Sequence, residues 1–278
     1  MKILLSSIVL KKLYKVYKMK GKEISDWLRE YLLNAKLSSL IVGVSGGIDS
    51  AVVSTLAAQT TKPTYVVSMP IHQEETQLKR ANNHIEWLQQ KYPNVIPMEI
   101  DLTRTYNKLI DTLTPSPHPS QSKWKHPTEI ANANTRARLR MTTLYNLSAT
   151  YGGLVVGTGN KIEDFGVGFF TKYGDGGVDI SPIADLYKSE VYTLGKELGV
   201  SDEIIGAAPT DGLWADGRTD EEQLGATYEE LEWAMKWFEI GDETTTVSER
   251  EKEILSIYLR HYMINKHKMI PIPIYQND

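Results

Sequence analysis

The chain has 278 residues, of which 41% are hydrophobic, enough for one well-buried α/β core. Its 31 basic and 35 acidic residues give a net charge of −4, without the excess positive charge that binds polynucleotides, so no nucleic-acid partner is expected. The sequence contains no cysteine, which excludes disulfides, thiolate metal sites and cysteine nucleophiles.

Residues 1–20 combine a short apolar run with five lysines that follow it. The run is too short to span a bilayer, and a signal peptide would carry its positive charges before the apolar stretch. We therefore expect residues 1–20 to be an N-terminal extension and residues 21–278 to form a single domain. We expect a cytoplasmic protein with no membrane partner.

The next segment has the period of an amphipathic helix. Its apolar side chains recur at helical spacing, at positions Ile24, Trp27, Leu28, Tyr31 and Leu32.

Four short apolar runs, each separated from the last by a helix-length segment, are typical of buried parallel strands. They lie at residues 40–44, 64–69, 95–100 and 154–157. This alternation predicts an α/β fold: a doubly wound parallel sheet with flanking helices.

The first run leads directly into Ser45-Gly46-Gly47-Ile48-Asp49-Ser50, followed by an apolar helical segment. Two glycines allow a sharp turn close to an anion, and the N–H groups that begin the helix point at the same place. Asp49 adds a hard oxygen ligand suited to Mg²⁺. A simpler alternative is a Gly-Gly turn with an aspartate that caps the helix.

Residues 45–50 match the S-G-G-x-D-S loop of the ATP pyrophosphatases, which have an adenine nucleotide alpha hydrolase-like fold. Further matches identify the chain as similar to the NAD synthetase family. They are N-T-R-A-R-L-R-M at 134–141, G-T-G-N-K-I-E at 157–163, residues 169–188, Pro209-Thr210 and His267-Lys268.

This resemblance implies roles for individual residues. Those implied to bind ATP are Gly43, Val44, Ser45, Gly46, Gly47, Ile48, Asp49, Ser50, Thr158, Lys188 and Thr210. Those implied to bind deamido-NAD are Arg138, Lys172, Asp179, His267 and Lys268. Asp49 and Glu163 are the implied Mg²⁺ ligands, and Asp49, Asp175 and Lys188 the implied catalytic residues.

The family resemblance also implies the reaction. A ligase of this kind uses ATP and Mg²⁺ to adenylylate the carboxylate of deamido-NAD, and ammonia then gives NAD, AMP and pyrophosphate. It implies a homodimer with deamido-NAD at the subunit interface. Glutamine-dependent relatives carry an amidase domain with a cysteine nucleophile, so the absence of cysteine excludes glutamine hydrolysis by this chain and favours ammonia.

Two other functions are compatible with the loop at 45–50. One is an RNA-modifying ATP pyrophosphatase, which the acidic charge balance opposes. The other is a catalytically silent adenine-nucleotide sensor, which the presence of Asp49, Glu163 and Lys188 together opposes. We also expect residues 205–223, rich in glycine and aspartate and without sustained periodicity, to act as a lid over the ATP site.

Overall fold

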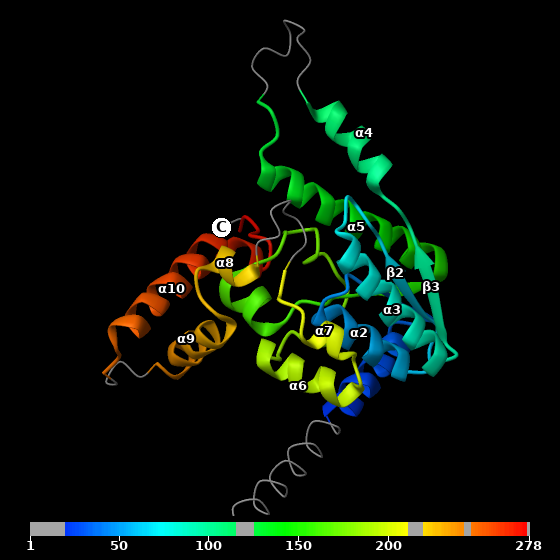
Figure 1. Ribbon diagram of the computed structural model, residues 1–278, viewed down its shortest axis with the longest axis horizontal. Helices are drawn as coiled ribbons and strands as arrows, with labels where there is room; N and C mark the ends of the chain where they lie inside the picture. Colours follow the sequence, from blue (N-terminus) through cyan, green and yellow to red (C-terminus); the bar gives the residue numbers. More distant parts are fainter. Residues whose placement is uncertain (1–19, 115–124, 211–218, 242–245, 277–278) are drawn as a thin grey trace, which may run out of the picture.

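The computed structural model describes residues 20–114, 125–210, 219–241 and 246–276 (Figure 1). Its centre is a parallel four-stranded sheet with the strand order β3-β2-β1-β4. The strands are β1 (Ser39–Gly43), β2 (Thr64–Ser68), β3 (Val95–Glu99) and β4 (Gly153–Val156). Each coincides with one of the four apolar runs, and the doubly wound sheet is confirmed.

The helices cover both faces of this sheet. On one face lie helical residues 20–34, α2 (Ile48–Gln59), α3 (Glu75–Lys91), α6 (Lys188–Leu198) and α7 (Asp202–Ile205). On the other lie α4 (Thr103–Leu113) and α5 (Glu129–Tyr151). Strand β1 shows the alternation that this requires, since Leu40 and Val42 pack toward α2 while Ile41 packs toward α5.

A second apolar cluster lies beside the sheet. It is formed by η2 (Lys161–Val167), a short π-helix, with α8 (Asp220–Leu224), α9 (Tyr228–Ile240) and α10 (Glu249–Met269). In Figure 1 these C-terminal helices lie to the left of the sheet. The side chains of Ile162, Leu224, Leu231 and Ile254 are almost fully buried in it. This cluster holds η2 against the carboxyl ends of the strands.

Two details differ from the pattern of the sequence. Strand β3 is exposed along much of its length, unlike β4 at the opposite edge of the sheet, and its edge position tolerates Pro97. In the helical residues 20–34, Leu28 and Leu32 are fully buried, but Trp27 and Tyr31 are each 44% exposed and contact each other. The apolar stripe is therefore wider than the face that packs on the sheet.

Among the described residues, no helix combines the length and the apolar character needed to cross a lipid bilayer.

Candidate functional site

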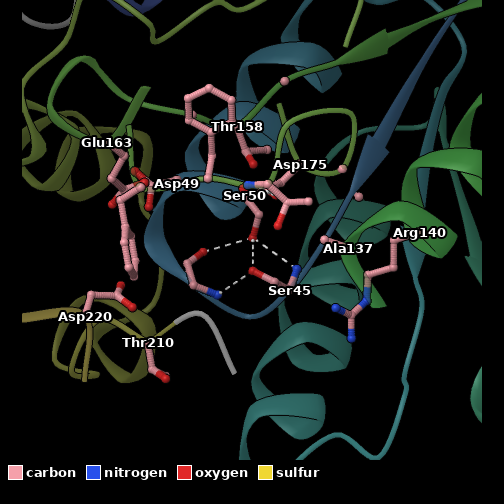
Figure 2. A pocket seen from close by; sticks show the side chains of 18 of the residues that line it. Ser45, Asp49, Ser50, Ala137, Arg140, Thr158, Glu163, Asp175, Thr210 and Asp220 are labelled. Carbon is pink, nitrogen blue, oxygen red and sulfur yellow. Dashed lines mark hydrogen bonds between the residues drawn. The ribbon is translucent and has the colours of Figure 1, made fainter. Parts of the chain in front are cut away.

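The loop between β1 and α2 is held in shape by its own hydrogen bonds (Figure 2). The Ser50 hydroxyl donates to the Gly47 carbonyl at 3.0 Å and accepts from the Ser45 amide at 3.2 Å, while the Gly47 amide donates to Ser45 Oγ at 3.3 Å. Gly46 has a φ of +86°, a left-handed conformation that favours glycine. No side chain caps the first turn of α2, so the helix presents its amide groups to an anion.

This loop forms one wall of a pocket of about 710 Å³ at the carboxyl ends of the strands. A cavity of this size suits a nucleotide-sized ligand. The site residues expected from the sequence that line it are Gly43, Val44, Ser45, Gly46, Gly47, Ile48, Asp49, Ser50, Arg138, Thr158, Glu163, Lys172, Asp175, Lys188, Thr210, His267 and Lys268.

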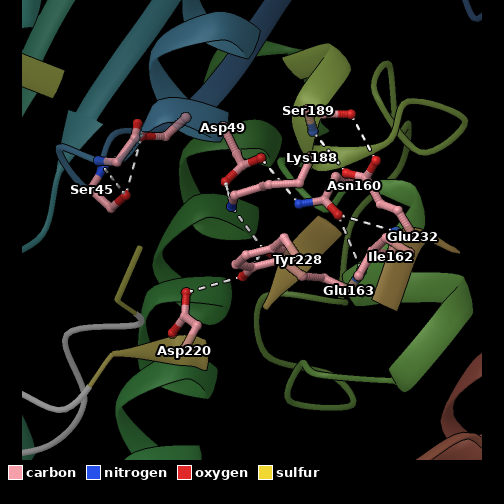
Figure 3. A network of polar contacts seen from close by, with 12 residues as sticks. Ser45, Asp49, Asn160, Ile162, Glu163, Lys188, Ser189, Asp220, Tyr228 and Glu232 are labelled. Atoms are coloured by element: carbon pink, nitrogen blue, oxygen red, sulfur yellow. Dashed lines mark hydrogen bonds and ion pairs between the residues drawn. The ribbon is translucent and has the colours of Figure 1, made fainter. Parts of the chain in front are cut away.

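Lys188 connects the two expected metal ligands. It is the first residue of α6 and only 3% exposed, and its Nζ lies 2.6 Å from Asp49 Oδ2 and 2.9 Å from Glu163 Oε1 (Figure 3). Burial alone would lower the pKa of Lys188, but the two carboxylates outweigh burial and raise it above its usual value. The lysine is therefore a fixed cation between α2, η2 and α6.

The two carboxylates respond differently to sharing one ammonium. Burial raises the pKa of Asp49, with only partial compensation from Lys188. Burial acts in the same direction on Glu163, but Lys188 and the hydroxyl of Tyr228 stabilise its charge and lower its pKa overall. Glu163 is thus the better stabilised anion of the pair.

Tyr228 and Asn160 were not identified from the sequence as functional, yet they hold these carboxylates (Figure 3). The Tyr228 hydroxyl donates to Glu163 Oε1 at 2.6 Å and lies 3.2 Å from Asp220 Oδ2. Asn160 caps η2 by accepting from the Glu163 amide at 3.1 Å, and its Nδ2 donates to Asp49 Oδ1 at 3.2 Å. Asn160 belongs to the matched motif at 157–163, but that resemblance assigned it no role.

Glu232 fixes the start of α6, and with it the backbone of Lys188. It is 5% exposed, accepts from the Ser189 amide at 2.9 Å and accepts from the Ser189 hydroxyl at 2.7 Å. A carboxylate at a helix N-terminus is favourable because the amide dipoles there are positive.

The expected deamido-NAD residues gather where the end of α10 meets the segment at 168–172. The Lys172 ammonium donates to the His267 carbonyl at 2.7 Å, and Lys268 donates to the carbonyls of Gly168 and Phe170 at 2.7 and 2.8 Å. Arg138 on α5 donates to the Lys172 carbonyl at 3.3 Å. These contacts leave a positively charged wall in the pocket.

The three arginines of α5, Arg136, Arg138 and Arg140, have different partners, because residues two positions apart do not share a helix face. Arg136 lies over the ring of Tyr106. Arg140 lines the pocket and donates to the Met69 carbonyl at 3.0 Å and to Gln73 Oε1 at 2.9 Å. Arg140 therefore ties α5 to the end of β2.

Asp175 and Asp164 place two further carboxylates in the pocket. The Asp175 side chain faces the cleft. The protein atoms around the cleft desolvate its carboxylate, and this desolvation raises the pKa of Asp175 to about 6. Its Oδ1 accepts from the Thr171 amide at 2.9 Å. Burial, together with Asp175 and Glu163, also raises the pKa of Asp164. Asp175 is therefore a carboxyl group whose pKa is close to neutral pH.

Asp179 is the one expected site residue that does not line the pocket. Its Oδ2 accepts from the Val155 amide at 2.8 Å, and its Oδ1 accepts from the Tyr145 hydroxyl at 2.9 Å. Both carboxylate oxygens are thus engaged beside β4 and α5, outside the cavity.

The expected lid is only partly described. Residues 211–218 lie outside the described residues, while Asp220–Gln223, expected to be aperiodic, form most of α8. Thr219 caps that helix by accepting from the Glu222 amide at 3.2 Å, a signal that the sequence contained. Thr210, just before the gap, and Asp220, shortly after it, both line the pocket (Figure 2).

The donor set around Lys188 fits a Mg²⁺ site with few protein ligands. Asp49 and Glu163 both lie within hydrogen-bonding reach of one ammonium, so both can approach one cation. No cluster of three or more acidic or histidine side chains suited to a metal occurs in the part of the chain that the structure describes. Mg²⁺ usually binds through one or two carboxylates, with water and substrate phosphates completing its shell.

Two curated relatives cover most of this chain. The NH(3)-dependent NAD(+) synthetase of Carboxydothermus hydrogenoformans is 39% identical over 77% of this chain and 83% of the relative. That of Alkaliphilus metalliredigens is 37% identical over 92% of this chain and 97% of the relative.

Two solved structures share the fold. The NMN synthetase of Francisella tularensis has a TM-score of 0.80 and 32% identity, covering 94% of this chain and 99% of that one. The NH3-dependent NAD synthetase of Campylobacter jejuni has a TM-score of 0.73 and 26% identity, with the same coverage. The profile of the NAD synthase family matches residues 21–270, and the chain belongs to that family.

Proposed function

We propose that this protein is an ammonia-dependent NAD synthetase, a ligase that amidates deamido-NAD at the expense of ATP. The observation that carries the proposal is the convergence of Asp49, Glu163 and Lys188 beside the loop at 45–50 in one nucleotide-sized pocket. The relatives named as NH(3)-dependent NAD(+) synthetases support the same reaction.

In the first step, an oxygen of the nicotinic acid carboxylate attacks the α-phosphorus of ATP. A new oxygen–phosphorus bond forms, the bond from the α-phosphorus to the bridging oxygen breaks, and pyrophosphate leaves. The amides at the start of α2 and the hydroxyls of Ser45 and Ser50 are placed to bind the departing phosphates. Lys188 offers positive charge close by.

In the second step, ammonia attacks the acyl carbon of the adenylate, and AMP leaves with the carboxylate oxygen. The nitrogen must lose a proton to become a neutral amide. Asp175 is suited to accept it, since its pKa of about 6 leaves it largely ionised at neutral pH yet basic enough to hold a proton transiently. No protein nucleophile takes part, so positioning and electrostatics provide the catalysis.

We also propose the finer features of the family. Asp49 and Glu163 would hold Mg²⁺, which neutralises phosphate charge when bound. The protein would act in the cytoplasm as a homodimer. Asp179 lies outside the pocket of its own chain. In a dimer it would contact deamido-NAD bound across the subunit interface.

Product analysis tests the proposal. The purified chain with deamido-NAD, ATP, Mg²⁺ and ammonium should produce NAD, AMP and pyrophosphate in equal amounts. Glutamine in place of ammonium should give only background NAD, and the rate should rise with pH at fixed total ammonium because only the unprotonated amine is nucleophilic. Formation of ADP and phosphate would contradict adenylylation.

A second substrate deserves a direct comparison, because the Francisella tularensis structure with 32% identity is named an NMN synthetase. Nicotinic acid mononucleotide carries the same reacting carboxylate and lacks only the adenylate half of deamido-NAD. The ratio of kcat/KM for the two substrates decides between them. A ratio in favour of the mononucleotide would make the chain an NMN synthetase with the chemistry described above.

A further inference from the structure

We propose that Arg80, on α3, is a further phosphate-binding residue of this site. Its guanidinium would contact the β- and γ-phosphates of ATP, the part of the nucleotide that leaves as pyrophosphate. The inference rests on the proposed function because it assumes that ATP binds in this pocket.

The first observation is that α3 lies directly on the turn of the phosphate loop. A Cβ added at Gly46 would lie 2.5 Å from the Gln77 carbonyl oxygen, 3.0 Å from the Ala81 amide nitrogen and 3.4 Å from Arg80 Cβ. The base of the Arg80 side chain is thus adjacent to the loop, and both Gly46 and Arg80 line the pocket. An arginine side chain that starts there is long enough to reach an anion bound by the loop.

The second observation is that the Arg80 side chain has no hydrogen-bond or ion-pair partner among the described residues. Its Nε is buried and makes no hydrogen bond, and no ion pair involves its guanidinium within the described residues. The other lysines and arginines that line the pocket are all engaged, namely Arg138, Arg140, Lys172, Lys188 and Lys268. Among the described residues that line the pocket, Arg80 is therefore the cation that remains available to a ligand.

A buried N–H group without an acceptor is unfavourable in the protein alone and is usually satisfied when the missing partner binds. The guanidinium fork matches the geometry of a phosphate better than any other side chain. The pyrophosphate gains negative charge as its bond to the α-phosphorus breaks, so a cation beside the loop favours the first step.

The location argues for ATP rather than for the nicotinate carboxylate. Arg80 lies beside Gly46, whereas Arg138 and Lys172 contact each other beside the end of α10. The two groups belong to different walls of the pocket. Loss of Arg80 should therefore weaken ATP and pyrophosphate binding selectively.

The test compares Arg80→Met with Lys79→Met. Lys79 is the neighbouring residue on α3, carries the same charge, is exposed and does not line the pocket, so it controls for the loss of one positive charge. Arg80→Met should raise both the KM for ATP and the inhibition constant of pyrophosphate about tenfold or more. Lys79→Met should change both by less than about twofold, and Arg80→Lys should recover part of the loss.

A structural role would affect both substrates, so the KM for deamido-NAD is measured in each variant and should stay unchanged. Equal ATP and pyrophosphate constants in Arg80→Met and the wild type would overturn the inference. So would an increase confined to the KM for deamido-NAD. If the wild-type protein itself released no AMP or pyrophosphate, the proposed function would fail instead, which separates the two results.

Discussion

The ammonium of Lys188 lies 2.6 Å from the carboxylate of Asp49, although 139 positions separate the two residues in the chain. The same ammonium binds Glu163 at 2.9 Å. In the protein alone, the lysine thus occupies the space between the two residues proposed to hold Mg²⁺. A bound metal and Lys188 must share these two anions, and this relationship leads to the first two predictions.

Lys188→Met leaves the largely buried carboxylates of Asp49 and Glu163 without their counterion. We expect the free energy of unfolding at pH 7 to fall by about 3 kcal/mol, because an unpaired buried charge is strongly unfavourable. NAD formation should fall at least about a hundredfold. Since Mg²⁺ replaces part of the missing charge, it should raise the Tm of the variant more than that of the wild type. Lys196→Met, at an exposed position of α6, is the control and should change neither property.

Asp49→Asn and Glu163→Gln each remove one charge and almost no volume. Both variants should fold, because Lys188 keeps one carboxylate partner. Pyrophosphate release should fall at least about a hundredfold, with a higher Mg²⁺ concentration needed for half-maximal rate. A Mg²⁺ titration of pyrophosphate release measures both quantities. Near-normal rates with unchanged Mg²⁺ dependence in both variants would mean that the metal lies elsewhere.

Tyr228→Phe removes the hydroxyl that donates to Glu163 while it retains the buried ring. Residues that orient a metal ligand typically change metal affinity by about 10- to 100-fold, so we expect the half-saturating Mg²⁺ concentration to rise by that order. The KM for deamido-NAD should not change. Tyr258→Phe, which alters another buried tyrosine of the same cluster, is the matched control. Equal Mg²⁺ dependence in both variants would show that the Tyr228 hydroxyl does not position Glu163.

Asp175→Asn should change the pH dependence of stability. The pKa of Asp175 is about 6 in the folded protein and lies near 3.8 when the carboxyl is free. Between these values the folded state binds the proton more tightly than the unfolded chain, so its contribution to stability is lost as pH rises through this window. The variant should therefore gain in Tm relative to the wild type from pH 4 to pH 7. A constant Tm difference across that range would contradict the raised pKa.

The sequence predicted the frame of the fold because buried parallel strands leave a strong apolar signal. All four strands were located by it, including β3, although an apolar run does not tell that β3 is largely exposed while β4, at the other edge, is buried. The exposure of Trp27 has the same origin, since a stripe of apolar residues does not tell how much of it a neighbouring element covers.

The site was predictable where its residues sit in short linear motifs, as Asp49 and Glu163 do. The sequence did not identify Tyr228 and Arg80 as site residues, because their roles depend on contacts between elements that meet only in the folded protein. Asp179 illustrates the opposite problem. It belongs to a long motif, yet its carboxylate turns toward Tyr145 rather than into the pocket, and sequence position alone does not give that direction.

The contact between Lys188, Asp49 and Glu163 also has a consequence for the order in which the protein matures. It joins α2, η2 and α6. The positions of these three elements depend on the core between the sheet and α2 and on the apolar cluster of η2 with the C-terminal helices. A partly assembled chain that has formed β1 and α2 alone contains the phosphate loop but lacks its charged partners. During refolding, enzymatic activity should accordingly return with the slowest structural phase, which makes turnover a reporter of the last assembly event rather than of early collapse.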